Sequence, residues 1–266
     1  MTTLSTLKKF KKEGTKFTCL TCYDAMFARM MQQAEIDTIL IGDSLGMVVQ
    51  GHDSTLPVTV NDMAYHTANI ARSNQHALIL ADLPFMSYVT LPDAVANSRK
   101  LMQAGAHVIK IEGGSELCDL VKTLAQAGTP TCVHLGLTPQ SVNVFGGDKI
   151  QGRGDAAAEK MLTDAKSVVE AGAALLVLEC VPAELAKAVT EAVAVPVIGI
   201  GAGADTDGQV LVMHDMLGMV HGRVPRFVHD FLTDERNSAR SIEGAFALYQ
   251  QSVRDGSFPT EQHQFS

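Results

Sequence analysis

The chain has 266 residues, of which 46% are hydrophobic, and a formal net charge of −8 at pH 7. This length suits one α/β barrel of about 200 to 250 residues with short extensions, and the apolar content supports a large core. No apolar run of about 18 residues indicates a membrane span, and the acidic balance argues against nucleic acid as the main partner, so we expect a soluble protein that binds a small molecule.

The cysteines and the N-terminus favour a reducing compartment. Five cysteines, an odd number, are typical of free thiols in a cytoplasmic protein. Cys19 and Cys22 form a C-x-x-C pair, but residues three apart in a strand point to opposite faces and no second pair completes a zinc set. The lysine cluster at residues 8–12 has neither the apolar core of a secretory signal nor the arginines of a transit peptide, so we expect a helical extension over residues 1–16.

Taken in chain order, apolar strands alternate with helical segments. The predicted strands are residues 17–22, 38–42, 77–82, 104–114, 130–134, 174–179, 195–200 and a segment within 210–220. The predicted helices are residues 24–34, a segment from about 61, 92–103, 115–128, 155–171, a segment from 182, and most of the C-terminal remainder up to an irregular tail at 256–266. This alternation predicts a (β/α)8 TIM barrel that forms a single domain over residues 1–266.

The fourth strand carries charge where a buried strand should be apolar. Ile109 and Ile111 would face the covering helices, which places Lys110 and Glu112 together on the other face. Charged groups are seldom buried unless they are paired or bind a ligand. An internal ion pair that only fixes the core is the alternative. Recurrence favours a functional site, because the segments ending at Glu112 and Glu179 share the same helix, small-residue turn and apolar strand.

Polar groups stand at the carboxyl ends of five predicted strands, where barrel active sites lie. They are Asp43, Asp82, Lys110, Glu112, His134 and Glu179. Three of them, Asp43, Asp82 and Glu112, are carboxylates from adjacent strands, which cannot all stay ionised without a cation. Hard oxygen ligands suit Mg²⁺, which would also bind a chelating oxyacid substrate. Zinc bound through His134, His214 or His221 is an alternative, but these histidines lack a zinc-ligand spacing.

Lys110 and Glu179, the other two charged groups at the strand ends, have separate expected roles. Lys110 would stabilise a substrate carboxylate or a developing enolate oxygen. A Schiff-base role is the alternative, but Glu112 on the same face favours the protonated and unreactive amine. Glu179 has no cation adjacent in the sequence and follows an apolar strand, so we expect it to act as the general base.

Three loops carry further expectations. Residues 43–59 are too apolar for a disordered segment and should be functional. The glycine-rich residues 136–154 are interpreted as a mobile lid or cosubstrate loop, with a plain surface excursion as the alternative. Residues 199–203 could bring backbone amides close to an anion, but we favour tight-turn chemistry.

The strand ends and their flanks resemble the ketopantoate hydroxymethyltransferase family. The matching segments are Gly42–Gly46, Gly51–Pro57, Ala81–Phe85, Lys110–Gly114, His134–Gln140 and Pro196–Gly203. The resemblance implies a Mg²⁺-dependent TIM-barrel transferase of pantothenate and coenzyme A biosynthesis. It would move a hydroxymethyl group from 5,10-methylenetetrahydrofolate to 3-methyl-2-oxobutanoate and give 2-dehydropantoate. It also implies a cytoplasmic homodecamer, built as a pentamer of dimers.

The resemblance also implies residue roles. Asp43 and Asp82 match metal ligands, and Glu112 matches the third metal-linked carboxylate. Ser44, with Asp43, Asp82 and Lys110, matches the 2-oxoacid site, which His134 also lines. Glu179 matches the proton acceptor. At Asp148 the family would more often have an aromatic residue, which bears on the folate contacts.

Two other functions compete. A Mg²⁺-dependent lyase or mutase on the same barrel would usually carry a catalytic cysteine in a lid loop, and none of the five cysteines falls in a candidate lid. A non-catalytic oxoacid or nucleotide sensor could use residues 199–203, but it would not need Lys110, Glu112 and Glu179 on separate strands.

Overall fold

Eight parallel strands close into a barrel in chain order, which confirms the predicted TIM barrel. A computed structural model of the chain describes residues 1–147, 149–220, 222 and 224–266. The strands are β1 (Phe17–Thr21), β2 (Thr38–Ile41), β3 (Leu78–Asp82), β4 (Val108–Glu112), β5 (Thr131–Gly136), β6 (Leu175–Glu179), β7 (Val197–Ile200) and β8 (Gly208–Leu211). Asp148 and His221, which carry expectations above, lie outside the described residues.

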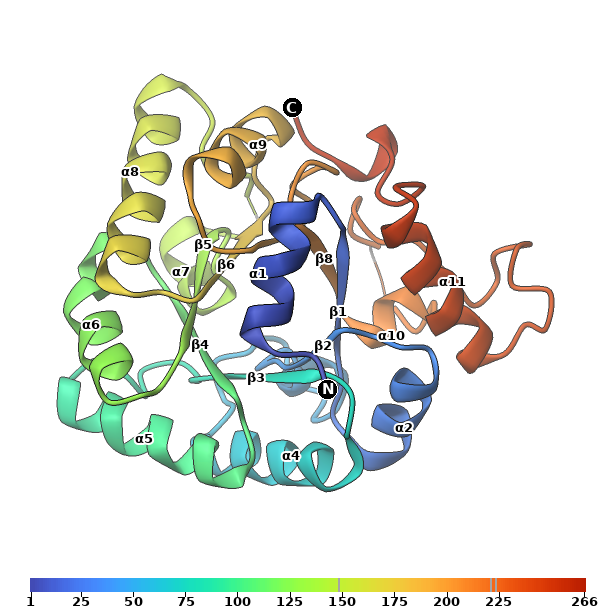
Figure 1. Cartoon of the computed structure of the whole chain (residues 1–266), viewed down its shortest axis with the longest axis horizontal. Helices are drawn as coiled ribbons and strands as arrows, with labels where there is room; N and C mark the ends of the chain where they lie inside the picture. The colour runs from blue at the N-terminus through green and yellow to red at the C-terminus, as the bar shows by residue number, and fades with distance from the viewer. Residues whose placement is uncertain (148, 221, 223) are drawn as a thin grey trace.

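Long helices lie around the barrel or, in the case of α1, across one end of it, and short ones lie in its loops (Figure 1). The long helices are α1 (Leu4–Glu13), α2 (Ala25–Gln33), α4 (Val60–Ser73), α5 (Leu91–Ala104), α6 (Cys118–Gln126), α8 (Asp155–Ala171), α9 (Ala183–Ala192) and α11 (Ile242–Arg254). The short ones are α3 (Leu45–Val48), α7 (Val142–Phe145), α10 (Met213–Met216) and the 3₁₀ turns at Ser115–Leu117, Pro139–Ser141 and Glu261–His263. None of the helices in the described parts is long and apolar enough to cross a membrane.

Local chemistry sets the ends of the helices. Thr59, two residues before the predicted cap, accepts a hydrogen bond from the backbone of Asp62 and so begins α4. Ser115 was expected to cap a helix but instead opens a 3₁₀ turn ahead of α6. The repeated Ala-Gly-Ala turns place Gly105 and Gly172 at left-handed φ angles of 114° and 117°, which end α5 and α8.

The prediction fails after β7. β8 begins at Gly208, before the predicted window. Gly208 packs against the ring of Phe17, and a Cβ atom at position 208 would lie 2.7 Å from a ring carbon. No helix separates β7 from β8, so the β-α alternation that guided the prediction is interrupted there. The expected helical remainder is also wrong, since among the described residues after β8 only α10 and α11 are α-helices, and residues 224–241 are an irregular segment with turns.

The core has two layers, as alternation along a buried strand requires. Ile109 and Ile111 pack outward against the helices, whereas Val108 belongs to the cluster inside the barrel. Cys19 lies inside and Cys22 outside, which confirms that the C-x-x-C side chains point apart. Cys19, Cys22, Cys118 and Cys132 are free thiols.

One end of the barrel is closed by its own chain. Leu7 of α1 is fully buried against the interior cluster that includes Phe17 at the start of β1. Figure 1 shows α1 in front of the strands, over their amino ends. Charged groups at the carboxyl ends therefore face the opposite side of the molecule.

Candidate active site

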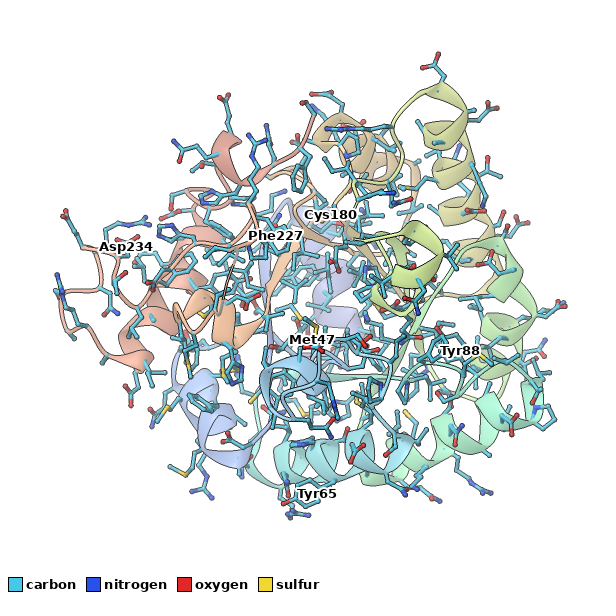
Figure 2. All side chains as sticks on the ribbon, turned by 180° about the vertical axis from the view of Figure 1, so that it is seen from behind. Met47, Tyr65, Tyr88, Cys180, Phe227 and Asp234 are labelled. Carbon is cyan, nitrogen blue, oxygen red and sulfur yellow. The ribbon has the colours of Figure 1, made fainter. Side chains whose placement is uncertain are left out.

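A cavity of about 250 Å³ opens at the carboxyl ends of the strands. Every predicted site residue lines it: Asp43, Ser44, Asp82, Lys110, Glu112, His134 and Glu179. Figure 2, seen from the side opposite α1, shows Met47, Cys180 and Phe227 of the same lining near the centre, whereas Tyr65 and Asp234 lie at the periphery. The fold thus brings together residues that are distant in the sequence.

Lys110 lies at the centre of the charged residues. Its ammonium group is 2.9 Å from Asp82 Oδ1 and 3.6 Å from Glu112 Oε1, and the residue is only 4% exposed. Burial alone would lower the pKa of Lys110, but Asp82, Glu112 and Asp43 outweigh it and hold that pKa well above its usual value. The lysine is therefore a fixed cation, which disfavours the Schiff-base alternative.

Three buried carboxylates surround this lysine. Asp82 Oδ2 accepts a hydrogen bond of 3.1 Å from the backbone of Asp43. Burial, together with Asp82 and Glu112, raises the pKa of Asp43 well above its usual value. Apart from the ion pairs with Lys110 and His134, Asp82 Oδ1 and Glu112 Oε1 have no hydrogen-bond partner among the described residues. A further cation would relieve this crowding.

The donor set suits Mg²⁺ better than zinc. Within the described ranges, no three His, Cys, Asp or Glu side chains converge closely enough to hold a metal ion by themselves. His214 lies beside the ring of Tyr23, at a centroid distance of 5.6 Å, and is absent from the cavity lining. Mg²⁺ needs only one or two protein carboxylates, because it keeps waters and takes oxygens from the substrate. Asp43 and Asp82 fit that requirement, and Glu112 lines the same cavity beside Lys110.

Gln140 is a site residue that the sequence analysis missed. Its side-chain amide donates to Asp43 Oδ2 at 2.8 Å and to the Leu83 carbonyl at 3.0 Å, while its backbone N–H donates to Glu112 Oε2 at 3.0 Å. The Tyr88 hydroxyl donates to Gln140 Oε1 at 2.7 Å. The start of the glycine-rich loop is therefore anchored in the site. Its place in the His134–Gln140 motif was the available signal.

Ser44 is held by a second residue that the sequence analysis did not single out. The hydroxyl groups of Ser44 and Tyr23 are hydrogen-bonded at 2.8 Å. Burial raises the pKa of Tyr23, so its phenol stays protonated and can orient the serine hydroxyl. The pair lies beside Asp43 at the end of β2.

His134 lies between two carboxylates. Its Nδ1 is 3.4 Å from Glu112 Oε1 and its Nε2 is 3.3 Å from Glu179 Oε2, distances of ion pairs rather than of well-aligned hydrogen bonds. Burial and nearby Lys110 disfavour the imidazolium, yet Glu112 and Glu179 outweigh them and raise the pKa of His134 to about 9. A cationic His134 thus holds the Glu179 carboxylate, whose side chain remains 16% exposed to the cavity.

The β7 turn is built for close packing. Gly201 has a φ of 59°, and a Cβ atom there would lie 2.9 Å from the ring of Phe227. At Gly203 it would lie 2.7 Å from the Ala183 Cβ. These contacts explain the glycines and support the tight-turn interpretation over an anion site.

The far wall of the cavity was also missed. It is formed by Ile200, Val210, Val212 and Phe227, with Asp215 from α10 as its carboxylate. Burial raises the pKa of Asp215 to about 6. Cys180 also lines the cavity, directly after β6 and at a left-handed φ of 50°.

Solved structures with the same barrel include distant proteins. Phosphoenolpyruvate phosphomutase from Streptomyces platensis aligns with a TM-score of 0.62 at 13% identity, over 81% of this chain and 83% of that one. A phosphonopyruvate hydrolase, solved in complex with oxalate and Mg²⁺, aligns with a TM-score of 0.61 at 13% identity, over 99% of this chain and 93% of that one. At these identities the likeness shows the fold alone.

Sequence relatives are much closer. A 3-methyl-2-oxobutanoate hydroxymethyltransferase of Psychrobacter cryohalolentis is 88% identical over the full length of both chains. The protein of that name in Acinetobacter baylyi is 59% identical over all of this chain and 98% of its own. The sequence model described as ketopantoate hydroxymethyltransferase matches residues 1–261. The chain therefore belongs to the ketopantoate hydroxymethyltransferase family, a family of pantothenate-synthesis transferases.

Proposed function

We propose that the chain transfers a hydroxymethyl group from 5,10-methylenetetrahydrofolate to 3-methyl-2-oxobutanoate, giving 2-dehydropantoate and tetrahydrofolate. Family membership supports a hydroxymethyl transfer, and the finer assignment rests on one observation. A fixed ammonium group, buried carboxylates and a partly exposed glutamate share one small cavity. That combination suits removal of a proton next to a keto group.

The charged residues provide the oxoacid site in this proposal. Lys110 faces the oxygens of the 2-oxoacid with its fixed positive charge, and Ser44 donates a hydrogen bond to them. Asp43 and Asp82 would hold Mg²⁺, with Glu112 as the third metal-linked carboxylate. When bound, the ion would supply Lewis acidity to the keto group.

Glu179 accepts the proton from C3 of the oxoacid. His134 orients the Glu179 carboxylate through the 3.3 Å contact. As the proton leaves, Lys110 stabilises the negative charge on the keto oxygen, where each unit of pKa shift is worth about 1.4 kcal/mol and up to tenfold in rate. The one-carbon unit is bonded to two folate nitrogens: the C3 carbanion replaces one of them and a water oxygen replaces the other, so that both carbon–nitrogen bonds break. The two nitrogens take up the proton held by Glu179 and one proton from the water, which leaves tetrahydrofolate and the hydroxymethyl product.

Replacing the proposed base tests this function. We expect Glu179→Gln to slow exchange of the C3 hydrogen with deuterated solvent by about 100- to 10,000-fold, because a positioned base contributes that much. Binding of the oxoacid and Mg²⁺, measured by calorimetry, should stay close to wild type. Glu184→Gln, at the exposed start of α9, is the matched control and should exchange normally. Unchanged exchange in Glu179→Gln would remove Glu179 from the base role.

A lyase or mutase on the same fold is the second candidate. The distant structural relatives favour it only through their shared barrel. Consumption of methylenetetrahydrofolate that depends on both the oxoacid and Mg²⁺ separates the transferase from it. The cytoplasmic location and the homodecamer stay predictions from the family resemblance.

A further inference from the structure

The cavity has two unlike walls. On one side lie the charged groups that the proposed function uses, all from β2 to β6. On the other side, which we name the apolar wall, lie Ile200, Val210, Val212 and Phe227. The proposed chemistry on the oxoacid makes no use of this wall.

Asp215 is the one carboxylate on the apolar side of the described lining. It projects from α10, it is half-buried, and no described group forms a hydrogen bond or ion pair with its side chain. Burial is the sole cause that raises its pKa, so no cation compensates the charge. An unpaired carboxylate in apolar surroundings is costly, which suggests that its partners arrive with a ligand.

We infer that Asp215 and the apolar wall bind the pterin ring of the folate cosubstrate, an inference that rests on the proposed function. The 2-amino group and the neighbouring ring N–H of a pterin are two parallel donors, which a carboxylate can accept side by side. The flat faces of the ring match the side chains of Phe227 and Val212. With this edge at Asp215, the opposite edge, which carries N5 and its methylene carbon, points toward the charged side.

Substitution of Asp215 tests the inference. Loss of hydrogen bonds to a charged acceptor should raise the KM for methylenetetrahydrofolate about ten- to a hundredfold in Asp215→Asn and Asp215→Ala. The KM for the oxoacid and the C3 exchange measured without folate should change less than about twofold, because neither involves the pterin. Asp205→Asn is the matched control, since Asp205 is an exposed aspartate in the loop before β8 and is not part of the lining.

A ligand change tests the same contact without altering the protein. Wild type should bind a tetrahydrofolate analogue with methyl in place of the 2-amino group at least about tenfold more weakly than tetrahydrofolate, while Asp215→Asn should bind both about equally. Equal binding of both ligands by the wild type, or an unchanged folate KM in Asp215→Asn, overturns the inference. Absence of C3 exchange in the wild type refutes the proposed function instead, so the two failures are distinguishable.

Discussion

Gln140 organises two of the three buried carboxylates from a single position. Its amide and its backbone N–H fix Asp43 and Glu112, and Tyr88 fixes the amide in turn. Such partners orient the groups that bind a metal, and their removal typically costs about 10- to 100-fold in metal affinity. The geometry of the charged side therefore depends on a residue from the loop after β5.

We expect Gln140→Ala to raise the Mg²⁺ concentration needed for half-maximal activity by about 10- to 100-fold. The cause is the loss of both side-chain bonds, which frees Asp43 to move. Titration of turnover with Mg²⁺ measures the effect, and Gln126→Ala on the exposed side of α6 serves as the control. An unchanged Mg²⁺ requirement would contradict a role for Gln140 in holding Asp43.

The charged residues on the strand ends of the site were predictable, whereas Gln140 and Asp215 were not. Lys110 and Glu112 contradict a buried strand, and that contradiction makes them visible in the sequence. Gln140 lies in a loop, where no periodicity constrains the direction of its side chain. Asp215 sits just past β8, whose position was wrong by a few residues, so its place beside the cavity could not be inferred.

At the scale of elements, α11 secures the seam where the barrel closes. Its residue Tyr249 is fully buried, and the phenol donates to the Cys19 carbonyl of β1 at 3.0 Å and to the Gln209 carbonyl of β8 at 2.8 Å. One hydroxyl thus bridges the first and last strands. Both acceptors belong to β1 and β8, which among the described strands form the one neighbouring pair that is not consecutive in the chain.

We expect Tyr249→Phe to lower the free energy of unfolding by about 1 to 2 kcal/mol, since two buried carbonyls lose a donor. Urea denaturation measures this change. Tyr65→Phe is the control, because Tyr65 is 66% exposed and should stay within about 0.5 kcal/mol of wild type. Equal stability of the two variants would show that the bridge contributes nothing.

Elements with a clear hydrophobic period were predicted well, and those without one were not. The apolar runs of β2 and β6 and the long pattern of α8 gave boundaries close to the observed ones. Residues 224–241 have no such period in the sequence. Their path is fixed by turns and by hydrogen bonds from the Asn237 side-chain amide to nearby carbonyls. That path depends on tertiary packing, which local pattern does not encode.

At the scale of the whole molecule, stability and chemistry lie at opposite ends of one barrel. α1 covers the amino ends of the strands, and the charged cavity opens at the carboxyl ends. Barrels generally separate the two roles in this way. A defect under α1 should therefore affect stability without altering turnover.

Leu7→Ala should destabilise the protein by about 2 to 5 kcal/mol, because a fully buried leucine leaves a cavity behind. The kcat and both KM values of the folded enzyme should remain within about twofold of wild type. Thermal unfolding and steady-state kinetics on the same sample measure both, with exposed Lys8→Ala as the control. A large fall in kcat at full folding would mean that the two ends are coupled.

The position of α1 across the amino ends of the strands also limits how reactants reach the cavity. Since side chains fill the interior below the cavity and α1 covers the amino ends of the strands, reactants and products pass through the carboxyl side of the barrel. Asp43 and Lys110, only 3% and 4% exposed, lie deep in the cavity, so a folate seated first on the apolar wall would obstruct the route of the keto acid. The small acid would then have to enter before the bulky donor, and the spent donor would have to depart before the enlarged acid.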